Sequence, residues 1–401
     1  MGIIVFVSIF ISIYGSLHFY LYRKIISQTH FSGWVNMAIS IFLVFMVTSP
    51  FISRMIEYRR GVGVSYALTL VSYLWMGLFF YLLLMNLGVD LINLFAGFIR
   101  RATSGEYGPF LIPRSYPTFF SILLISIGIC VFAYFEALNI GVSRITIETS
   151  KLPEHIEELV IAQVSDLHLG VLVGEKRLKK VTSIIRDINP DIIVSTGDLV
   201  DENLDTMEGL EEELRRINPG MGKYAVTGNH EFYAGIERSV KFTQDSGFIL
   251  LRNQYTNLNG IINLIGLDDP TAKRFGSNVG ENISLLYSKC DPSLYTILLC
   301  HQPTGFKKNA SSMPIDLQLS GHTHKGQLFP FNILTHIFFP LQGGFFEVEG
   351  RRLYASRGTG TWGPPLRFLS PPEIAVIRLK KVRAQGNRLQ GSVVRVRERP
   401  L

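Results

Sequence analysis

Cysteine is scarce in this chain of 401 residues, and its positions exclude common thiolate sites. Only Cys130, Cys290 and Cys300 are present. They form no Cys-x-x-Cys motif and no Cys/His spacing typical of a zinc site. A disulfide between Cys290 and Cys300 is one interpretation, but we expect three buried free thiols.

Two further absences concern the ends of the chain. The first apolar segment lacks a basic start and a small-residue cleavage site, and Arg23 and Lys24 follow it directly. We therefore interpret it as an anchor and not as a signal peptide. The basic tail, residues 381–401, lacks interleaved aromatic residues, so we expect no nucleic-acid partner. We expect this tail to be flexible, with attraction to anionic lipid headgroups as the alternative.

Long apolar runs dominate the first part of the chain. Hydrophobic residues make up 47% of the sequence, and they concentrate before about residue 140. A membrane domain is expected at residues 1–145, with four spans at about 3–22, 34–56, 66–98 and 118–140. Each reaches the ~20 residues that cross ~30 Å of hydrocarbon. The third is longer and contains Asp90, which we interpret as interfacial, with a functional intramembrane carboxylate as the alternative.

The orientation of these spans is weakly determined. Basic residues are divided evenly between the two sides, and the net charge of +7 is explained largely by Arg and Lys beside the spans. An even number of spans places both termini on one side. The basic tail favours a cytoplasmic C-terminal domain.

Short apolar runs alternate with helical periodicity from Glu157 onward. We expect helices at 174–189, 207–217 and 236–245. We expect strands at 159–164, 192–195, 224–227, 261–267, 295–300, 316–319, 351–356 and 373–379. This alternation predicts an α/β layered domain over residues 155–380.

Five short motifs follow strand-like runs in this domain. They are Ser165-Asp166-Leu167-His168, Gly197-Asp198, Gly228-Asn229-His230-Glu231, His301 and Gly321-His322-Thr323-His324. The candidate metal ligands among them are Asp166, His168, Asp198, Asn229, His301, His322 and His324. Oxygen and imidazole donors without thiolate suit Mn, Fe or Zn. Seven ligands exceed the need of one hydrated ion, but they fit two divalent ions if one carboxylate bridges.

Taken together, the motifs resemble those of the calcineurin-like metallophosphoesterase superfamily, from about Leu159 to Leu379. The segment Gly266–Pro270, Ser356-Arg357-Gly358 and Pro371-Pro372-Glu373 are similar to its bacterial membrane-associated branch. That branch includes proteins similar to phosphodiesterases acting on UDP-2,3-diacylglucosamine. The resemblance implies a four-layer α/β/β/α sandwich with the metals at one sheet edge. Together with the four expected spans, we expect a multi-pass protein of a bacterial inner or plasma membrane.

The resemblance also implies a role for each motif residue. Asp166, His168 and His324 would hold one metal, Asn229, His301 and His322 the other, and Asp198 would bridge them. His230 would protonate the leaving oxygen or contact the phosphate.

The implied activity is metal-dependent hydrolysis of a phosphoric ester. We expect a phosphodiesterase acting on a lipid-linked or pyrophosphate substrate beside membrane lipids. The alternatives are a phosphomonoesterase acting on a phosphoprotein or nucleotide, and a non-catalytic membrane receptor or scaffold. The apolar stretch after His324 is expected to pack as an irregular hairpin, with contact to lipid as the alternative.

Overall fold

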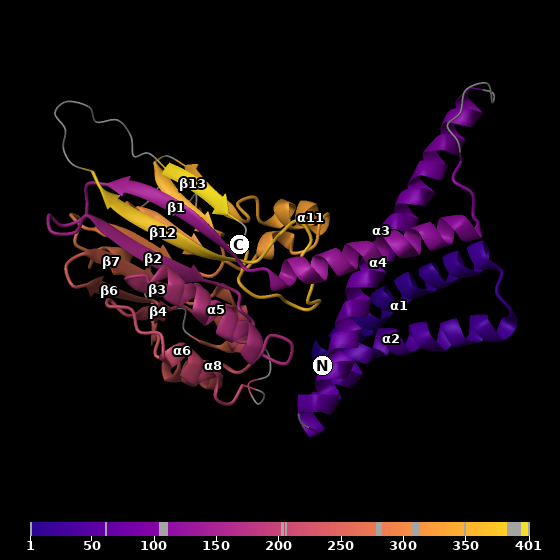
Figure 1. Ribbon diagram of the computed structural model, residues 1–401, viewed down its shortest axis with the longest axis horizontal. Helices are drawn as coiled ribbons and strands as arrows, with labels where there is room; N and C mark the ends of the chain where they lie inside the picture. Colours follow the sequence, from indigo (N-terminus) through magenta and orange to yellow (C-terminus); the bar gives the residue numbers. More distant parts are fainter. Residues whose placement is uncertain are drawn as a thin grey trace. The chain divides into compact units, whose positions relative to one another are not determined.

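The computed structural model describes residues 2–60, 62–103, 111–201, 204, 207–277, 283–306, 313–348, 350–382 and 394–399. Two compact units make up the chain, and Figure 1 colours them along the sequence. The helical unit comprises Met1–Tyr134 with Gly363–Pro365, and the sheet unit comprises Phe135–Trp362 with Leu366–Leu401. The boundary lies before residue 145 because β1 (Gly141–Thr149) pairs in parallel with β12 (Glu373–Lys381) of the sheet unit.

Four long helices begin the chain. They are α1 (Gly2–Thr29), α2 (Gly33–Arg60), α3 (Val62–Ala102) and α4 (Tyr116–Leu138). Three segments are long and apolar enough to cross a membrane: Gly33–Ile56, Ser65–Ala102 and Tyr116–Leu138. The helix α1 covers the first expected span without meeting these criteria among the described residues, so the number four stays a prediction.

Asp90 of α3 is engaged by two side chains of α1. Its carboxylate pairs with Lys24 and accepts a hydrogen bond of 2.7 Å from the hydroxyl of Tyr20. About a third of the Asp90 side chain remains exposed. The carboxylate therefore joins two helices of the helical unit through an ion pair.

Two sheets form the sheet unit. The first has seven strands in the order β13-β1-β12-β2-β3-β4-β5, and the second has six in the order β10-β11-β9-β8-β7-β6. The remaining bounds in the first are β2 (Glu158–Val164), β3 (Ile192–Ser195), β4 (Lys223–Ala225), β5 (Ile249–Leu250) and β13 (Val394–Arg399). Those in the second are β6 (Gln254–Leu258), β7 (Ile262–Gly266), β8 (Tyr295–Leu299), β9 (Leu317–Ser320), β10 (Gly344–Val348) and β11 (Arg351–Ala355).

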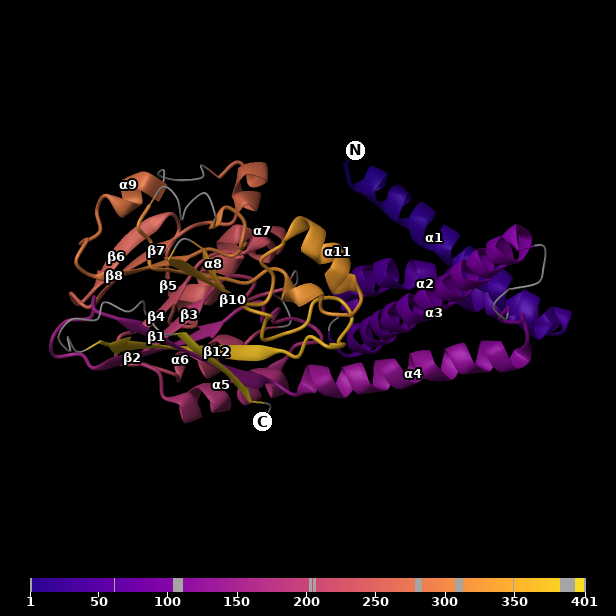
Figure 2. The ribbon, with the colours of Figure 1, turned by 90° about the horizontal axis from the view of Figure 1, so that it is seen from above.

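Successive side chains along the strands of the first sheet point to opposite faces and pack into two separate cores. In β2, Ala162 and Val164 pack against the helices α5 (Glu175–Ile188), α6 (Leu210–Arg215) and α8 (Ile236–Asp245). Leu159 and Ile161 point the other way, into the core shared with the second sheet. Figure 2 shows α5 and α9 (Ile283–Tyr287) on opposite sides of the paired sheets. The result is an α/β fold with mixed sheets.

The outer face of the second sheet has a thinner cover. In the part of the chain that the structure describes, Leu286 of α9 packs against Ile265 and Leu298 of that sheet, together with Met313 and Ile315 from a loop. One short helix and loops thus occupy the position expected for a fourth layer. The four-layer arrangement stays a prediction in that respect.

Two segments differ from the sequence-based expectations. Val394–Arg399, expected within a flexible tail, forms β13 antiparallel to β1, which corrects that expectation. The rest of the tail, 383–393 and 400–401, lies outside the described residues. The apolar stretch after His324 forms the helix α11 (Phe331–Phe338) followed by β10, and so it is not an irregular hairpin.

Candidate metal centre

All seven predicted ligands stand where strands end. The strands β2, β3 and β4 run parallel in the first sheet, as do β8 and β9 in the second. The ligands follow β2 (Asp166, His168), β3 (Asp198), β4 (Asn229), β8 (His301) and β9 (His322, His324). Loops that leave the carboxyl ends of parallel strands meet at one edge, where binding sites commonly form.

One group of three side chains converges at this edge. The Nε2 atoms of His168 and His324 lie 3.1 Å apart. The Nε2 atom of His324 is 3.5 Å from Oδ1 of Asp166. Two ligand atoms that each lie ~2.1 Å from a shared ion are about 3.4 Å apart, so these spacings match a site that could hold one cation.

A second group lies beside the first. The Nε2 atom of His301 is 3.2 Å from Oδ1 of Asn229 and 3.1 Å from Nδ1 of His322. The Nδ1 atom of His322 is also 3.0 Å from Oδ1 of Asn229. This triangle of one oxygen and two nitrogen atoms has the dimensions of a second cation site.

Asp198 lies between the two groups. Its Oδ2 atom is 3.1 Å from Nε2 of His301 and 3.8 Å from Nε2 of His168. It therefore belongs to two of the three clusters of potential ligands that the described residues form. Its Oδ1 atom accepts a hydrogen bond of 2.8 Å from the backbone N–H of His230.

The protonation states of the imidazoles suit metal binding. Burial lowers the pKa of His168 to about 3 and that of His322 to about 4, so both rings offer neutral lone pairs at neutral pH. The Nδ1–H of His301 donates to the carbonyl oxygen of Thr196 at 2.8 Å and leaves Nε2 facing the cluster. Burial opposes a charge on His301, but Asp198 holds its pKa well above the ordinary value. A proton thus occupies a position that a metal ion would take.

The backbone at the site is strained. Five of the seven predicted ligands have positive φ angles although none is glycine: Asp166 (52°), His168 (51°), Asp198 (50°), His322 (70°) and His324 (46°). Side chains disfavour this region, and a non-glycine residue there costs on the order of 1–3 kcal/mol. Such residues persist where the surrounding structure fixes them, and they are frequent at functional sites.

His230 lies at the edge of the cluster with an acidic partner. Its Nδ1 atom is 3.1 Å from Oδ1 of Asp201, and its ring meets the ring of His168 edge to face at 4.6 Å. The ring of Trp362 lies 6.0 Å away. Asp201 was not singled out from the sequence, although it stands only three residues after Asp198.

Two other buried residues support the ligands and were also missed. Glu231 accepts hydrogen bonds from the backbone N–H groups of Asp198 at 3.0 Å, Leu199 at 2.8 Å and Gly228 at 2.6 Å, and so joins two ligand loops. Arg367 is fully buried and donates to Nδ1 of His324 at 2.9 Å. Only Glu231 had a signal in the sequence, because it belongs to one of the five motifs.

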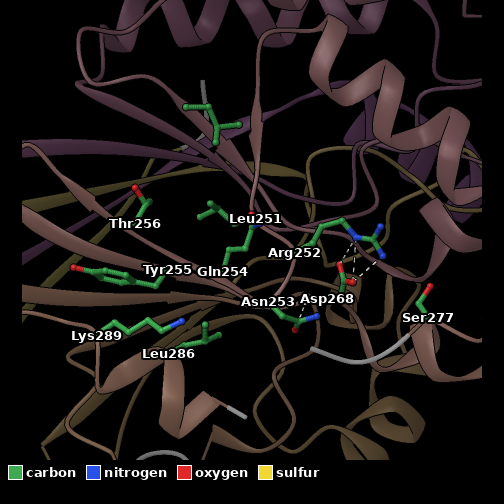
Figure 3. Close-up of a pocket in the computed structure, with 11 residues that line it drawn as sticks. Leu251, Arg252, Asn253, Gln254, Tyr255, Thr256, Asp268, Ser277, Leu286 and Lys289 are labelled. Carbon is green, nitrogen blue, oxygen red and sulfur yellow. Dashed lines mark hydrogen bonds and ion pairs between the residues drawn. The ribbon is translucent and has the colours of Figure 1, made fainter. Parts of the chain in front are cut away.

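A large open cavity lies next to a carboxylate that supports the loop of Asn229. Its volume is about 890 Å³, and none of the seven predicted ligands lines it. Figure 3 shows Arg252 and Asp268 paired at its wall, with N–O distances of 2.9–3.1 Å. Asp268 accepts a hydrogen bond of 2.9 Å from the hydroxyl of Thr227, two residues before Asn229. The segment Gly266–Pro270 thus contributes a carboxylate that fixes a ligand loop.

Comparison with known proteins gives the class of this fold and site. The model of the calcineurin-like phosphoesterase family matches residues 159–326. An uncharacterized metallophosphoesterase of Aquifex aeolicus is 37% identical over 64% of this chain and 98% of its own length. A transmembrane protein with a metallophosphoesterase domain from Danio rerio is 32% identical over 78% of this chain and 74% of its own.

A third relative spans nearly the whole chain. An uncharacterized metallophosphoesterase of Campylobacter jejuni is 29% identical over 94% of this chain and 98% of its own length. The chain belongs to the calcineurin-like metallophosphoesterase family and is a metal-dependent phosphoesterase. The apolar helices and the transmembrane relative support association with a membrane.

Proposed function

We propose that this protein is a membrane-anchored phosphodiesterase with a two-metal centre. The observation that carries the proposal is the position of Asp198 between two groups of ligands. One carboxylate shared by two cations reduces their repulsion, and two divalent ions ~3.5–4 Å apart are typical of enzymes that cleave phosphate esters.

Each metal would have its own ligands in addition to Asp198. One would be held by Asp166, His168 and His324, and the other by Asn229, His301 and His322. The donors are oxygen and nitrogen only, which suits Mn, Fe or Zn. The neutral imidazoles of His168 and His322 and the strained, well supported ligand loops favour this assignment.

The chemistry divides between the ions and the chain. When bound, divalent ions lower the pKa of water and neutralise charge on phosphoryl oxygens. His230 protonates the departing ester oxygen, because Asp201 at 3.1 Å stabilises its protonated form and orients its ring.

The substrate that we propose is lipid-linked or contains a pyrophosphate. Only Asn139 and Ile140 separate the last helix of the apolar region from the sheet that bears the site, which supports a substrate presented at a membrane surface. The resemblance to the branch acting on UDP-2,3-diacylglucosamine points the same way. A phosphomonoesterase is the second candidate activity. For the topology, we propose a multi-pass membrane protein with its sheet unit in the cytoplasm.

Hydrolysis of bis(nitrophenyl) phosphate with added Mn²⁺ tests the activity. We expect turnover by the full-length protein in detergent and about two bound metal ions per chain by elemental analysis. Asp198→Ala should lose both, whereas the exposed Asp187→Ala on α5 should lose neither. Full metal occupancy in Asp198→Ala would contradict the bridging role. Metal binding without turnover in the wild type would favour the receptor or scaffold.

The products identify the substrate class. UDP-diacylglucosamine, nucleotide sugars and lipid pyrophosphates can be incubated with the detergent-purified protein and analysed by mass. Two phosphate-bearing products from one substrate would indicate cleavage of a pyrophosphate. Release of inorganic phosphate alone would indicate a phosphomonoesterase.

A further inference from the structure

The helix α11 presents an apolar face that the sheet unit leaves uncovered. None of its residues is buried. Ile333, Leu334, Ile337 and Phe338 repeat at the spacing of one helix face, and Ile337 and Phe338 are 68% and 69% exposed. Leu369 is 56% exposed. We call these four residues together with Leu369 the apolar collar. Contiguous exposed apolar side chains mark a surface that binds a partner or a membrane.

Hydrogen bonds link this collar to the end of the last apolar helix. The last turn of α4, from Phe135 on, belongs to the sheet unit. Glu136 in that turn accepts a hydrogen bond of 2.9 Å from the backbone N–H of Leu369. The neighbouring carbonyl of Phe368 accepts a bond of 3.0 Å from Phe329, two residues before α11 begins. The collar is therefore fixed close to the point where a candidate membrane helix ends.

Basic residues surround the same point. Lys180 of α5 donates to the carbonyl oxygen of Leu138 at 2.8 Å, and Arg177 donates to that of Ala137 at 2.6 Å. Lys176 is exposed on the same helix, as is Lys179, which pairs with Glu175 at 2.7 Å. A cluster of cations at the end of a membrane helix complements anionic lipid headgroups, each adding about 1 kcal/mol of attraction near the surface.

We propose that the apolar collar inserts into the lipid bilayer that holds α4, with the basic end of α5 against the headgroups. The apolar face covers the acyl boundary, as in an interfacial amphipathic helix. The insertion itself does not depend on the proposed function; only its consequence for the substrate rests on that function. Phe339, the residue directly after α11, meets the ring of His322 edge to face at 5.1 Å, so the collar adjoins the metal centre. The substrate would then be a phosphate diester within the bilayer surface.

Photo-crosslinking tests the insertion without any activity measurement. Benzoylphenylalanine replaces Ile337 in the full chain, reconstituted in vesicles of phosphatidylethanolamine and phosphatidylglycerol. The matched control replaces Ile249, which is 54% exposed. Ile249 lines the cavity next to β6, and β6 and β10 form the two opposite edges of the second sheet. We expect lipid adducts at position 337 and none at 249. Equal yields at both positions would overturn the proposal.

Kinetics separate a failure of docking from a failure of the proposed function. We expect Ile337→Asp to raise the KM for nitrophenyl phosphatidate in vesicles by about tenfold or more, the loss expected for one isoleucine no longer buried. Its KM for soluble bis(nitrophenyl) phosphate and the values of Ile249→Asp should stay unchanged. An equal change on both substrates contradicts the docking. No hydrolysis of either substrate by the wild type contradicts the proposed function and leaves the crosslinking result to decide the docking.

Discussion

At the scale of single residues, the proposed role of His230 is proton transfer and not metal binding. Its ring contacts Asp201 and its backbone N–H donates to the carboxylate of Asp198, but it is not needed to complete either group of three ligands. We expect His230→Asn to keep both metals and to lose turnover by about 10²–10⁴-fold, the usual contribution of a general acid. Elemental analysis and hydrolysis of bis(nitrophenyl) phosphate measure the two quantities. A parallel loss of metal would show that His230 is a ligand.

The pH dependence of metal affinity should report on Asp166. Burial raises the pKa of Asp166 to about 6, so its proton must leave before the carboxylate can bind an ion. The contribution of Asp166 to the affinity is therefore gained as the pH rises through 6 and is lost as the pH falls through that value. We expect Mn²⁺ to bind about tenfold more weakly at pH 5 than at pH 7, by calorimetric titration. His168 and His322 stay neutral over this window. An unchanged affinity would contradict the role of Asp166.

Residue types and spacing were sufficient to predict the seven converging side chains. Each stands directly after a strand-like run, and the pairs Asp-x-His and His-x-His are recognisable without a structure. The supports were harder to predict. Arg367 lies 43 positions after His324 and is held by carbonyl groups that only the folded loops bring together. Asp201 has no distinctive neighbours in the sequence.

At the scale of elements, the absence of a side chain at Gly228 allows two ligand loops to approach each other. A Cβ atom on Gly228 would overlap the carboxylate and the backbone nitrogen of Asp198. We expect Gly228→Ala to displace Asp198, lower the melting temperature and abolish metal binding. Gly220→Ala should leave both nearly unchanged, because a Cβ at Gly220 meets open space. Metal binding at full strength in Gly228→Ala would contradict this account, and thermal melting with elemental analysis is the measurement.

The strands that could be predicted are those with continuous apolar runs. β2, β3, β8 and β12 are mostly buried, and each contains a run of apolar residues. β6 and β10 lie at sheet edges and are only partly buried, so their sequences lack this signal. β1 follows the last apolar helix after two residues, and its start merges with that run. α11 was missed because its apolar face is not buried.

At the scale of the whole molecule, bound metal should stabilise the sheet unit. The ligands come from both sheets, so an ion held between them joins strands distant in the sequence. Excess Mn²⁺ at 100 times its Kd would add about 2.7 kcal/mol to the free energy of unfolding. We expect a higher melting temperature with Mn²⁺ than with a chelator, measured by differential scanning calorimetry. Asp198→Ala should lose this difference, whereas Asp187→Ala should keep it.

The continuity of α4 with the sheet unit has a consequence for encounter with substrate. The helix runs through the unit boundary, and its last turn is bound by Arg177 and Lys180 of α5. An enzyme tethered so closely to a membrane meets a membrane-bound substrate by diffusion in two dimensions and not in three. For the lipid-linked substrate that we propose, the effective concentration would be set by the number of molecules per area of leaflet and would not change on dilution of the surrounding water.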